Sequence, residues 1–349
     1  MSNVTILAAE NLVVRIEDTD GNVGWGEACS GPMMTGDLPQ GLAAAARYMA
    51  RLLVGITVDD PTAFAERIDK IIFGNRGAKS AFEMAIYDLA GQRAGAPVAD
   101  LLGGTVRREV PALFILAAGD RTIDLEMAKR KADEGFVAFK VKVGTTNVNL
   151  DLERCASVRQ LLGKQARISA DANEGYSRND ALHFASHADE VGLEFIEQPV
   201  RGDDLEGMAL VAAATPVPIC ADEGIHTIQD IERHHELGAA RGASLKTIKL
   251  GGLWPTISAG RLMDKRHMSI NLAGKVAESS IASAAIAQLA GALPQIDWDA
   301  SVTCQYLESD LTKSSMGPLK GLIRLPERPG LGIEVDVEKL ARFATAVAD

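Results

Sequence analysis

Charged residues recur along this chain at a near-constant interval, and each one ends a short apolar run. They are Lys140 and Lys142, Asp171, Glu197, Asp222 and Lys246. The steps from 142 to 171, 197, 222 and 246 are 29, 26, 25 and 24 residues. One strand with its crossover helix needs about this length, because a connection between parallel strands takes a dozen or more residues. The interval therefore predicts successive parallel strands, each ending in a polar residue.

Alternating strands and helices of this kind predict an α/β barrel, in which the C-terminal ends of all strands meet at one mouth. The chain has 349 residues, enough for a barrel and a smaller domain. The predicted barrel strands are residues 110–116, 139–143, 168–170, 195–196, 219–220, 245–250, 269–272 and 296–299. Before them, a hairpin at 11–17 and 23–27 and helical periodicity at 40–53, 61–72 and 79–91 predict an α+β unit. The C-terminal tail, with a short amphipathic helix, is expected to return to that unit.

Composition excludes several classes of protein. A net charge of −11 argues against a nucleic-acid surface, which needs clustered Lys and Arg. No stretch of 18 or more apolar residues predicts a membrane span, and no secretory signal is visible. The cysteines at 29, 155, 220 and 304 form no Cys-x-x-Cys pair and are expected to be reduced thiols. We therefore expect a cytoplasmic protein with no nucleic-acid or membrane partner.

Three carboxylates, Asp171, Glu197 and Asp222, end adjacent predicted strands. Oxygen ligands in this number suit a hard divalent cation, and Mg²⁺ keeps coordination positions open for substrate oxygens. Zinc fits less well, because no His or Cys ends a neighbouring strand. A single acid here could instead cap a helix or pair with a lysine, but three at matched positions favour a metal site.

The lysines are candidate bases. Lys140 and Lys142 lie two apart on one strand and so point to the same face. Two ammonium groups beside a cation are costly unless one is neutral, which is how a lysine becomes a base near neutral pH. Lys246, on the sixth strand, lies across the barrel and would reach the opposite face of a substrate carbon. Lys249, three residues further along a strand, is expected to point away and to be structural.

Further polar residues are candidate substrate contacts. Glu278 lies just past the seventh strand, where it could hydrogen-bond a substrate carboxylate, and Asn173 follows the first predicted metal ligand by two residues. Asp297 and Asp299 share a face of the predicted eighth strand, and at the mouth they would hold a cationic group such as an ammonium. The alternative is that they are turn aspartates. Glu223 faces away on a strand, but a loop could turn it inward.

Together these motifs resemble the enolase superfamily, in its muconate-lactonizing-enzyme-like subgroup. The resemblance covers nearly the whole chain. The motifs are Gly24-Trp25-Gly26-Glu27, Lys140-Val-Lys142, Asp171-Ala-Asn173, Glu197-Gln-Pro, Asp222-Glu223, Lys246 before Gly251-Gly252, Glu278-Ser279 and Pro329-Gly-Leu-Gly. No His ends the seventh strand, which argues against the mandelate-racemase-like subgroup. Relatives usually have a further strand and a closing loop at the N-terminus. Residues 1–10 are short for both, so either the natural start lies further upstream, or part of the closing loop is reduced and the loop at 29–38 carries more of the substrate contact.

The resemblance implies a modified (β/α)₇β barrel, residues 109–317, capped by an α+β domain, residues 1–108, to which residues 318–349 return. It implies one Mg²⁺ held by Asp171, Glu197 and Asp222, which binds a small-molecule carboxylate substrate. Lys142 and Lys246 would exchange the α-proton on opposite faces through an enediolate, with Lys140 spreading its charge. Similar proteins are often homo-oligomers, and we expect the same here.

Two bases favour racemisation or epimerisation, and Asp297 with Asp299 resembles the Asp-x-Asp of dipeptide epimerases. A proline-type amino acid fits the same residues. Dehydration of a hydroxyproline-type substrate uses the same enediolate, and muconate cycloisomerisation is a third alternative, although two aspartates would repel a dicarboxylate. From other classes, a Schiff-base aldolase using Lys142 or Lys246 leaves the carboxylates unexplained, and a non-catalytic binding protein on this scaffold stays open.

Overall fold

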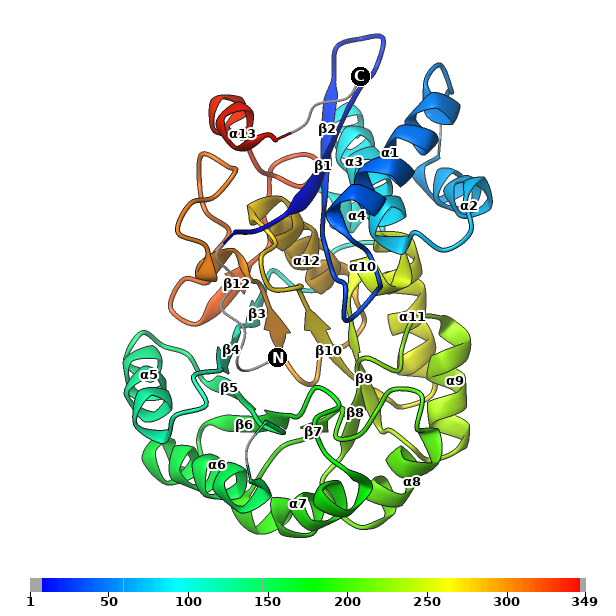
Figure 1. The fold of residues 1–349 in the computed structure, drawn as a ribbon. Coiled ribbons are helices and arrows are strands. Elements are labelled where there is room, and N and C mark those ends of the chain that lie inside the picture. The colour runs from blue at the N-terminus through cyan, green and yellow to red at the C-terminus, as the bar shows by residue number, and fades with distance from the viewer. Residues whose placement is uncertain (1–7, 59, 146, 346–349) are drawn as a thin grey trace.

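The N-terminal part of the protein forms a cap of two strands and four helices (Figure 1). The computed structural model describes residues 8–58, 60–145 and 147–345, so most of the segment 1–10 considered above lies outside it. The cap consists of β1 (Asn11–Glu17), β2 (Val23–Cys29), α1 (Pro39–Leu53), α2 (Pro61–Ile71), α3 (Arg76–Ala94) and α4 (Val98–Leu101). The two strands pair antiparallel, as the sequence predicts.

Helix α3 lies directly on strand β2, and two glycines make this possible. A Cβ atom at Gly26 would stand 1.9 Å from the carbonyl oxygen of Ala81, and one at Gly24 would stand 2.1 Å from that of Ala85. Any larger residue would push the helix off the strand. The alternation Gly-Trp-Gly therefore sets how closely the hairpin and α3 pack, and this packing fixes the position of Glu27 at the end of β2.

Eight parallel strands form the barrel, which a bridge between Ala112 and Ala300 closes. In sequence order the strands are β4 (Leu113–Leu116), β5 (Ala138–Lys142), β6 (Arg167–Asp171), β7 (Ile196–Glu197), β8 (Ile219–Ala221), β9 (Gly242–Leu245), β10 (Ser269–Ala273) and β11 (Ala300–Ser301). Each pairs with its sequence neighbours. The α/β barrel predicted from the strand-end interval is confirmed.

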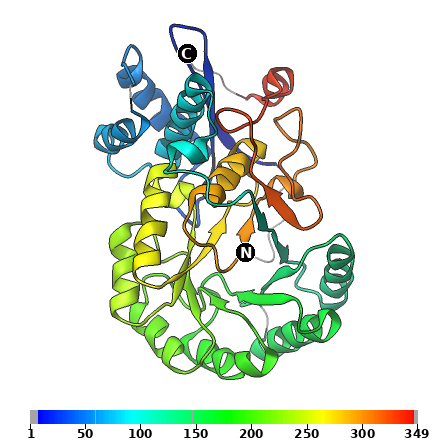
Figure 2. The same ribbon diagram turned by 180° about the vertical axis from the view of Figure 1, so that it is seen from behind.

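Helices follow the strands around the outside (Figure 2). They are α5 (Arg121–Asp133), α6 (Val148–Leu162), α7 (Arg178–Val191), α8 (Leu205–Ala213), α9 (Ile228–Glu236), α10 (Thr247–Leu250), α11 (Leu253–Lys265) and α12 (Ser280–Ala292). Polar side chains cap the start of several of them and accept the first free amides. Asp120 does so for α5, Asn147 for α6 and Ser177 for α7. These caps place the loops that surround the mouth.

Three predicted strands differ from the observed ones. Residues 110–116 divide into β3 (Glu109–Pro111), which lies outside the barrel, and β4. Residues 245–250 contain only the last residue of β9, because the chain then turns into α10. The eighth strand is β11, beyond residues 296–299. The last two differences change the positions of Lys249, Asp297 and Asp299.

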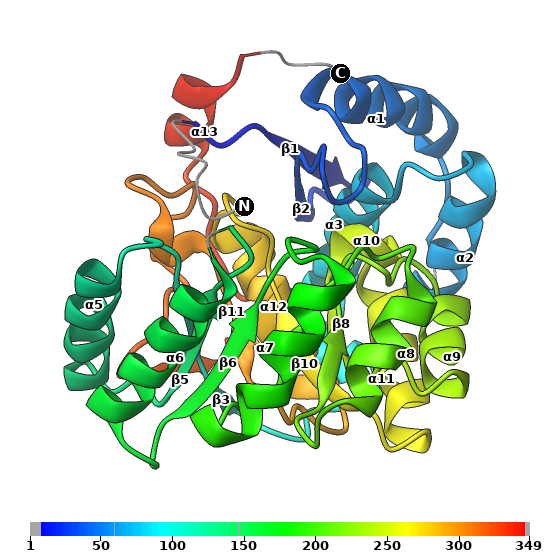
Figure 3. The ribbon, with the colours of Figure 1, turned by 60° about the horizontal axis from the view of Figure 1, so that its bottom comes forward.

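The C-terminal tail returns to the cap, as expected. After the short helix η1 (Cys304–Tyr306), β12 (Leu322–Arg324) pairs antiparallel with β3. The Asp88 carboxylate of α3 accepts a hydrogen bond from the amide of Leu331 at 2.7 Å. Figure 3 shows the final helix α13 (Val337–Phe343) beside the cap. Among the described residues, no helix combines the length and apolarity needed to cross a membrane.

Candidate active site

The predicted strand-end residues meet at one mouth of the barrel. Lys142, Asp171 and Glu197 are the last residues of β5, β6 and β7, and they stand in register with one another across the sheet. Asp222 and Lys246 directly follow β8 and β9. Since all these strands are parallel, their C-terminal ends bring the residues together, on the side of the barrel that the cap covers (Figure 3).

Each of the three strand-end carboxylates is paired with a lysine. Lys140 donates to Glu197, and Lys246 donates to Asp222. Lys142 donates to Asp171 at 2.5 Å from Nζ to Oδ2. Five of these six groups are nearly inaccessible to solvent, and the sixth, the Lys142 side chain, keeps 16% of its surface exposed. Of these three lysines, Lys142 is therefore the one with the most open approach.

Lys249 also contacts the site, which corrects the prediction that it points away. Its Nζ donates to the side-chain and main-chain oxygens of Asp222, both at about 2.5 Å. The cause is local structure, because residues 247–250 form a helical turn instead of a strand. Positions three apart lie on the same side of a helix. Lys246 and Lys249 thus hold the two oxygens of one carboxylate.

The pairing determines the protonation of these groups. Burial alone would raise the pKa of Asp222, but Lys246 and Lys249 lower it far below its usual range. Burial would lower the pKa of Lys246, but Asp222 and Glu197 raise it above its usual range. This is opposite to the direction expected of a base near neutral pH. Burial, with the negative charge of Asp171, raises the pKa of Glu197.

The donor set suits a hard cation in its chemistry, although the lysines now occupy it. The carboxylates of Asp171, Glu197 and Asp222 supply only oxygen, and Glu223 Oε2 is buried without a hydrogen-bond partner in the described structure. Within residues 8–58, 60–145 and 147–345, no three His, Cys, Asp or Glu side chains converge closely enough to make a complete metal site. Metal binding would require the lysines to release the carboxylates.

Asn173 and Glu223 extend the site beside Lys142. Lys142 Nζ donates to Asn173 Oδ1 at 2.6 Å, and Asn173 Nδ2 donates to Glu223 Oε1 at 2.9 Å. Asn173 adopts φ 42°, a left-handed conformation that asparagine tolerates. Glu223 therefore turns toward the site, as one of the two alternatives anticipated. Burial, together with Asp222 and Asp171, raises its pKa to about 7.

Glu278 lies buried between the barrel and the cap. Its Oε2 accepts a hydrogen bond from the amide of Lys275 at 2.9 Å. Burial and the nearby Glu27 raise its pKa to about 8, and Lys246 is close enough to lower it in part. Glu27 itself caps α12, accepting from the amide and hydroxyl of Ser279. Glu278 is thus a neutral carboxylic acid near pH 7 at the mouth.

Asp297 and Asp299 do not reach the mouth, and the prediction that they do is wrong. Asp299 forms a two-pronged ion pair with Arg167, the first residue of β6, at 2.7 and 2.8 Å. Asp297 accepts from the amide of Ile270 near the start of β10, at 3.1 Å. Both therefore lie at the opposite, N-terminal end of the barrel. Asp299 has φ 59°, a left-handed conformation that does not fit a strand.

Sequence reasoning missed two polar residues inside the barrel. Lys140 Nζ also donates to Asn271 Oδ1 at 3.2 Å, and Ser244 Oγ donates to Glu197 Oε1 at 2.8 Å. Both are fully buried. A buried polar residue inside an apolar strand was the available signal, because such a group needs a partner.

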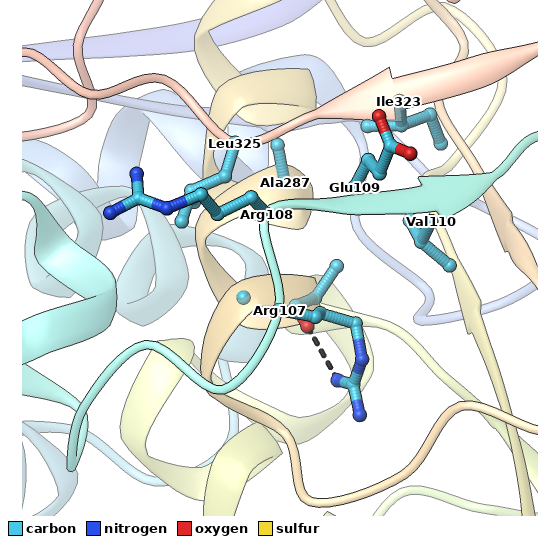
Figure 4. A pocket seen from close by; sticks show the side chains of 9 residues that line it. Arg107, Arg108, Glu109, Val110, Ala287, Ile323 and Leu325 are labelled. Carbon is cyan, nitrogen blue, oxygen red and sulfur yellow. Dashed lines mark hydrogen bonds between the residues drawn. The ribbon is translucent and has the colours of Figure 1, made fainter.

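A small pocket at the far end of α12 carries no such chemistry (Figure 4). Arg107 lies there and donates to the main-chain oxygens of Ala290 and Leu293 at 2.7 and 2.6 Å. It thereby satisfies the last carbonyls of the helix, where a positive charge is favourable. This is a structural role, and the pocket does not compete with the mouth as a site.

A capped parallel barrel with lysines and carboxylates at its mouth is typical of a class of barrel enzymes. Comparison with known proteins shows to which family of this class the chain belongs. A family model described as the mandelate racemase / muconate lactonizing enzyme N-terminal domain matches residues 1–103. One described as enolase C-terminal domain-like matches residues 124–340. The chain belongs to this family, the muconate-lactonizing-enzyme-like part of the enolase superfamily.

The relatives are isomerases. An L-Ala-D/L-Glu epimerase of Clostridium acetobutylicum is 32% identical, with 95% of this chain and 92% of the relative covered. An N-succinyl-L-Arg/Lys racemase of Bacillus cereus is 29% identical, with 95% and 89% covered. The structure of a muconate lactonizing enzyme from Pseudomonas putida superposes with a TM-score of 0.91 at 29% identity, covering 96% of this chain and 94% of that one. The protein is therefore an isomerase of the enolase superfamily.

Proposed function

We propose that this enzyme removes and returns the α-proton of a small carboxylate substrate, acting as a racemase or epimerase of an amino acid derivative. The observation that carries the proposal is the placement of Lys142 and Lys246 at the ends of β5 and β9, on separate carboxylates of one mouth. Two lysines from different walls of the barrel reach the two faces of one carbon. Epimerases and racemases among the relatives support this outcome.

In the proposed reaction Asp171, Glu197 and Asp222 would hold Mg²⁺, which would supply a Lewis acid that makes the α-proton of a carboxylate substrate more acidic. Nζ of Lys142 takes or gives a proton on one face of the α-carbon, and Nζ of Lys246 does so on the other. The ammonium of Lys140 stabilises the negative charge that develops on the substrate. A cation on Asp222 and Glu197 would weaken the attraction that raises the pKa of Lys246, and burial would then favour its neutral amine.

The substrate class follows in part from what the mouth lacks. With Asp297 and Asp299 at the other end of the barrel, these residues give no support to a substrate with a free ammonium there. The β11 end carries Ser301 and Thr303 instead, both buried and uncharged. We therefore favour an N-acylated amino acid over substrates with a free ammonium, such as a dipeptide or an unsubstituted proline.

Two alternative reactions, cycloisomerisation and dehydration, also fit the residues at the mouth. Repulsion by aspartates no longer opposes muconate cycloisomerisation, an activity named for several relatives. Dehydration of a hydroxyproline-type substrate needs an acid for the departing hydroxyl. Glu278, with a pKa of about 8, is protonated at neutral pH and lies near Lys246. In that case Glu278 gives its proton to the hydroxyl, which leaves as water.

The test is α-proton exchange in D₂O with Mg²⁺, followed by NMR over N-acyl amino acids, prolines, hydroxyprolines, their betaines, dipeptides and muconate. Loss of the α-proton signal on one class, abolished by EDTA and, for one of the two enantiomers, by Lys246→Ala, supports the proposal and identifies the substrate. Lys313→Ala, at an exposed lysine paired with Glu334, is the matched control. Exchange that survives both Lys142→Ala and Lys246→Ala would refute the two-base assignment, and borohydride trapping with a keto acid would instead indicate a Schiff base.

A further inference from the structure

A buried charged network lies directly behind Lys142, and neither catalysis nor metal binding accounts for it. Its members are Asp124 of α5 and Asp151 and Arg154 of α6, which keep 2%, 0% and 5% of their surface exposed. Arg154 Nη2 donates to Asp124 Oδ2 at 2.6 Å, and Nη1 donates to Asp151 Oδ1 at 3.1 Å. Such a buried charged cluster is costly, because three ionised groups leave water together.

The network ties the C-terminal ends of three neighbouring strands together. Arg154 Nη2 also donates to the main-chain oxygen of Lys142 at 3.0 Å. Asp151 Oδ2 accepts from the Gly144 amide and from the Tyr176 hydroxyl, both at 2.9 Å. Asp124 Oδ1 accepts from the Ala118 amide at 3.1 Å. Ala118 follows β4, Gly144 follows β5 and Tyr176 follows β6. All these contacts lie on the mouth side of the barrel.

The segment after Lys142 has little freedom to adjust. Gly144 adopts φ +84°, and a Cβ atom there would stand 2.7 Å from the carbonyl oxygen of Ala172. Asp151 and Asp124 lie in the first turns of their helices, where the helix dipole favours negative charge. The network therefore holds one defined backbone position at the end of β5.

We propose that Arg154, supported by Asp124 and Asp151, is a positioning residue for Lys142 and so for only one of the two faces of the substrate. The proposal rests on the two-base function above. Lys246 is held differently, through Asp222 and the helical turn of α10, whereas the hydrogen bonds of Arg154 within the described residues go to Asp124, Asp151 and the Lys142 carbonyl. Loss of Arg154 should therefore weaken one half of the reaction selectively.

The matched control lies on the same helix. Arg159 of α6 donates to three main-chain oxygens, those of Gly163, Ala166 and Gly192, at the opposite end of the barrel. Arg154 and Arg159 each donate three hydrogen bonds, so Arg159→Gln and Arg154→Gln remove the same number. Arg154→Lys keeps a positive charge beside the two carboxylates, and it serves as the second variant if Arg154→Gln does not fold.

The first measurement needs no substrate. Amide hydrogen exchange is followed by mass spectrometry in the peptide that contains Lys142 and Gly144. We expect Arg154→Gln or Arg154→Lys to speed exchange there by about tenfold, because the amide and carbonyl contacts loosen, and Arg159→Gln to leave it unchanged. Unchanged protection in the Arg154 variants would overturn the proposal whatever the substrate is.

The second measurement separates positioning from a general loss of structure. Deuterium uptake from D₂O is measured separately for the two enantiomers of an active substrate, and Lys142→Ala and Lys246→Ala define which base serves which enantiomer. We expect the Arg154 variants to slow the Lys142-dependent exchange by about 10- to 100-fold, as small misplacements of a catalytic group do, and the Lys246-dependent exchange by less than about threefold. Equal losses on both faces would overturn it. If the unaltered enzyme exchanges no substrate, the proposed function fails, and the first measurement still decides the contact between Arg154 and the end of β5.

Discussion

Glu83 offers a sharp test of how the cap is attached to the barrel. It belongs to α3 of the cap, only 1% of its surface is exposed, and its Oε1 accepts from the Trp254 amide at 2.7 Å. Trp254 is the second residue of α11, so Glu83 caps a barrel helix. Two effects oppose each other here. Burial favours the neutral acid, whereas the N-terminal amides of a helix favour the carboxylate.

Burial is the larger effect and raises the pKa of Glu83 from 4.5 to about 8. Above pH 4.5 the unfolded chain ionises this group while the folded protein keeps the proton, so the unfolded state binds fewer protons and stability falls as pH rises. At 1.36 kcal/mol per pKa unit, the loss is about 1 kcal/mol at pH 5 and about 3 kcal/mol at pH 7. Above about pH 8 the folded protein ionises too, and the loss stops growing.

Glu83→Gln keeps the shape and an acceptor oxygen but cannot ionise. We expect its stability relative to the unaltered protein to rise by about 2 to 3 kcal/mol between pH 5 and pH 7. Urea unfolding at pH 5, 6, 7 and 8 measures this difference, and Glu327→Gln at an exposed ion pair is the control. A relative stability that falls with pH would refute the reasoning, because it would mean that the helix terminus keeps Glu83 ionised.

Three further outcomes follow from the site. Lys249→Met should reduce thermal stability by about 3 to 5 kcal/mol, because Asp222 loses a buried partner, and calorimetry measures it. Asp299→Asn should leave kcat within about threefold, since Arg167 and Asp299 lie at the opposite end of the barrel, and a large loss in steady-state rates would return Asp299 to the site. If Glu278 acts as an acid, the rate should fall above about pH 8, and Glu278→Gln should remove that limb of the pH profile.

The strand-end residues were predictable because two signals coincide in them. A charged residue at the end of a buried apolar run is rare in a structural strand, and the interval between such residues matches one βα unit. Lys142, Asp171 and Glu197 therefore appear in the structure at the ends of strands, as predicted. Their pairing with one another was not predictable, because it depends on which lysine faces which carboxylate across the barrel.

The wrong predictions for Lys249 and for Asp297 and Asp299 share a cause, since a short apolar pattern fits more than one backbone conformation. The alternation around Trp298 satisfies a strand, yet its indole stacks on Phe195 with ring centroids 4.5 Å apart and Asp299 is left-handed. The run after Lys246, Thr247-Ile-Lys-Leu250, is short and only half apolar, so it fits a strand or a helical turn equally well. The partners of Arg154 were beyond sequence reasoning, because Asp124 lies 30 residues away and only the folded barrel brings them together.

The charges at the two ends of the barrel have different consequences. At the N-terminal end Arg167 keeps 35% of its side chain exposed, whereas its partner Asp299 keeps only 6%, so desolvation of the carboxylate offsets part of the attraction and the pair contributes modestly to stability. At the mouth, Lys140, Lys246 and their carboxylates are almost completely buried, and apolar residues of the same volume would stabilise the fold as well or better. Stability therefore does not explain why the mouth is charged. The proposed function would explain it, because there the carboxylates would exchange lysine for a cation and each displaced lysine would be free to carry a proton.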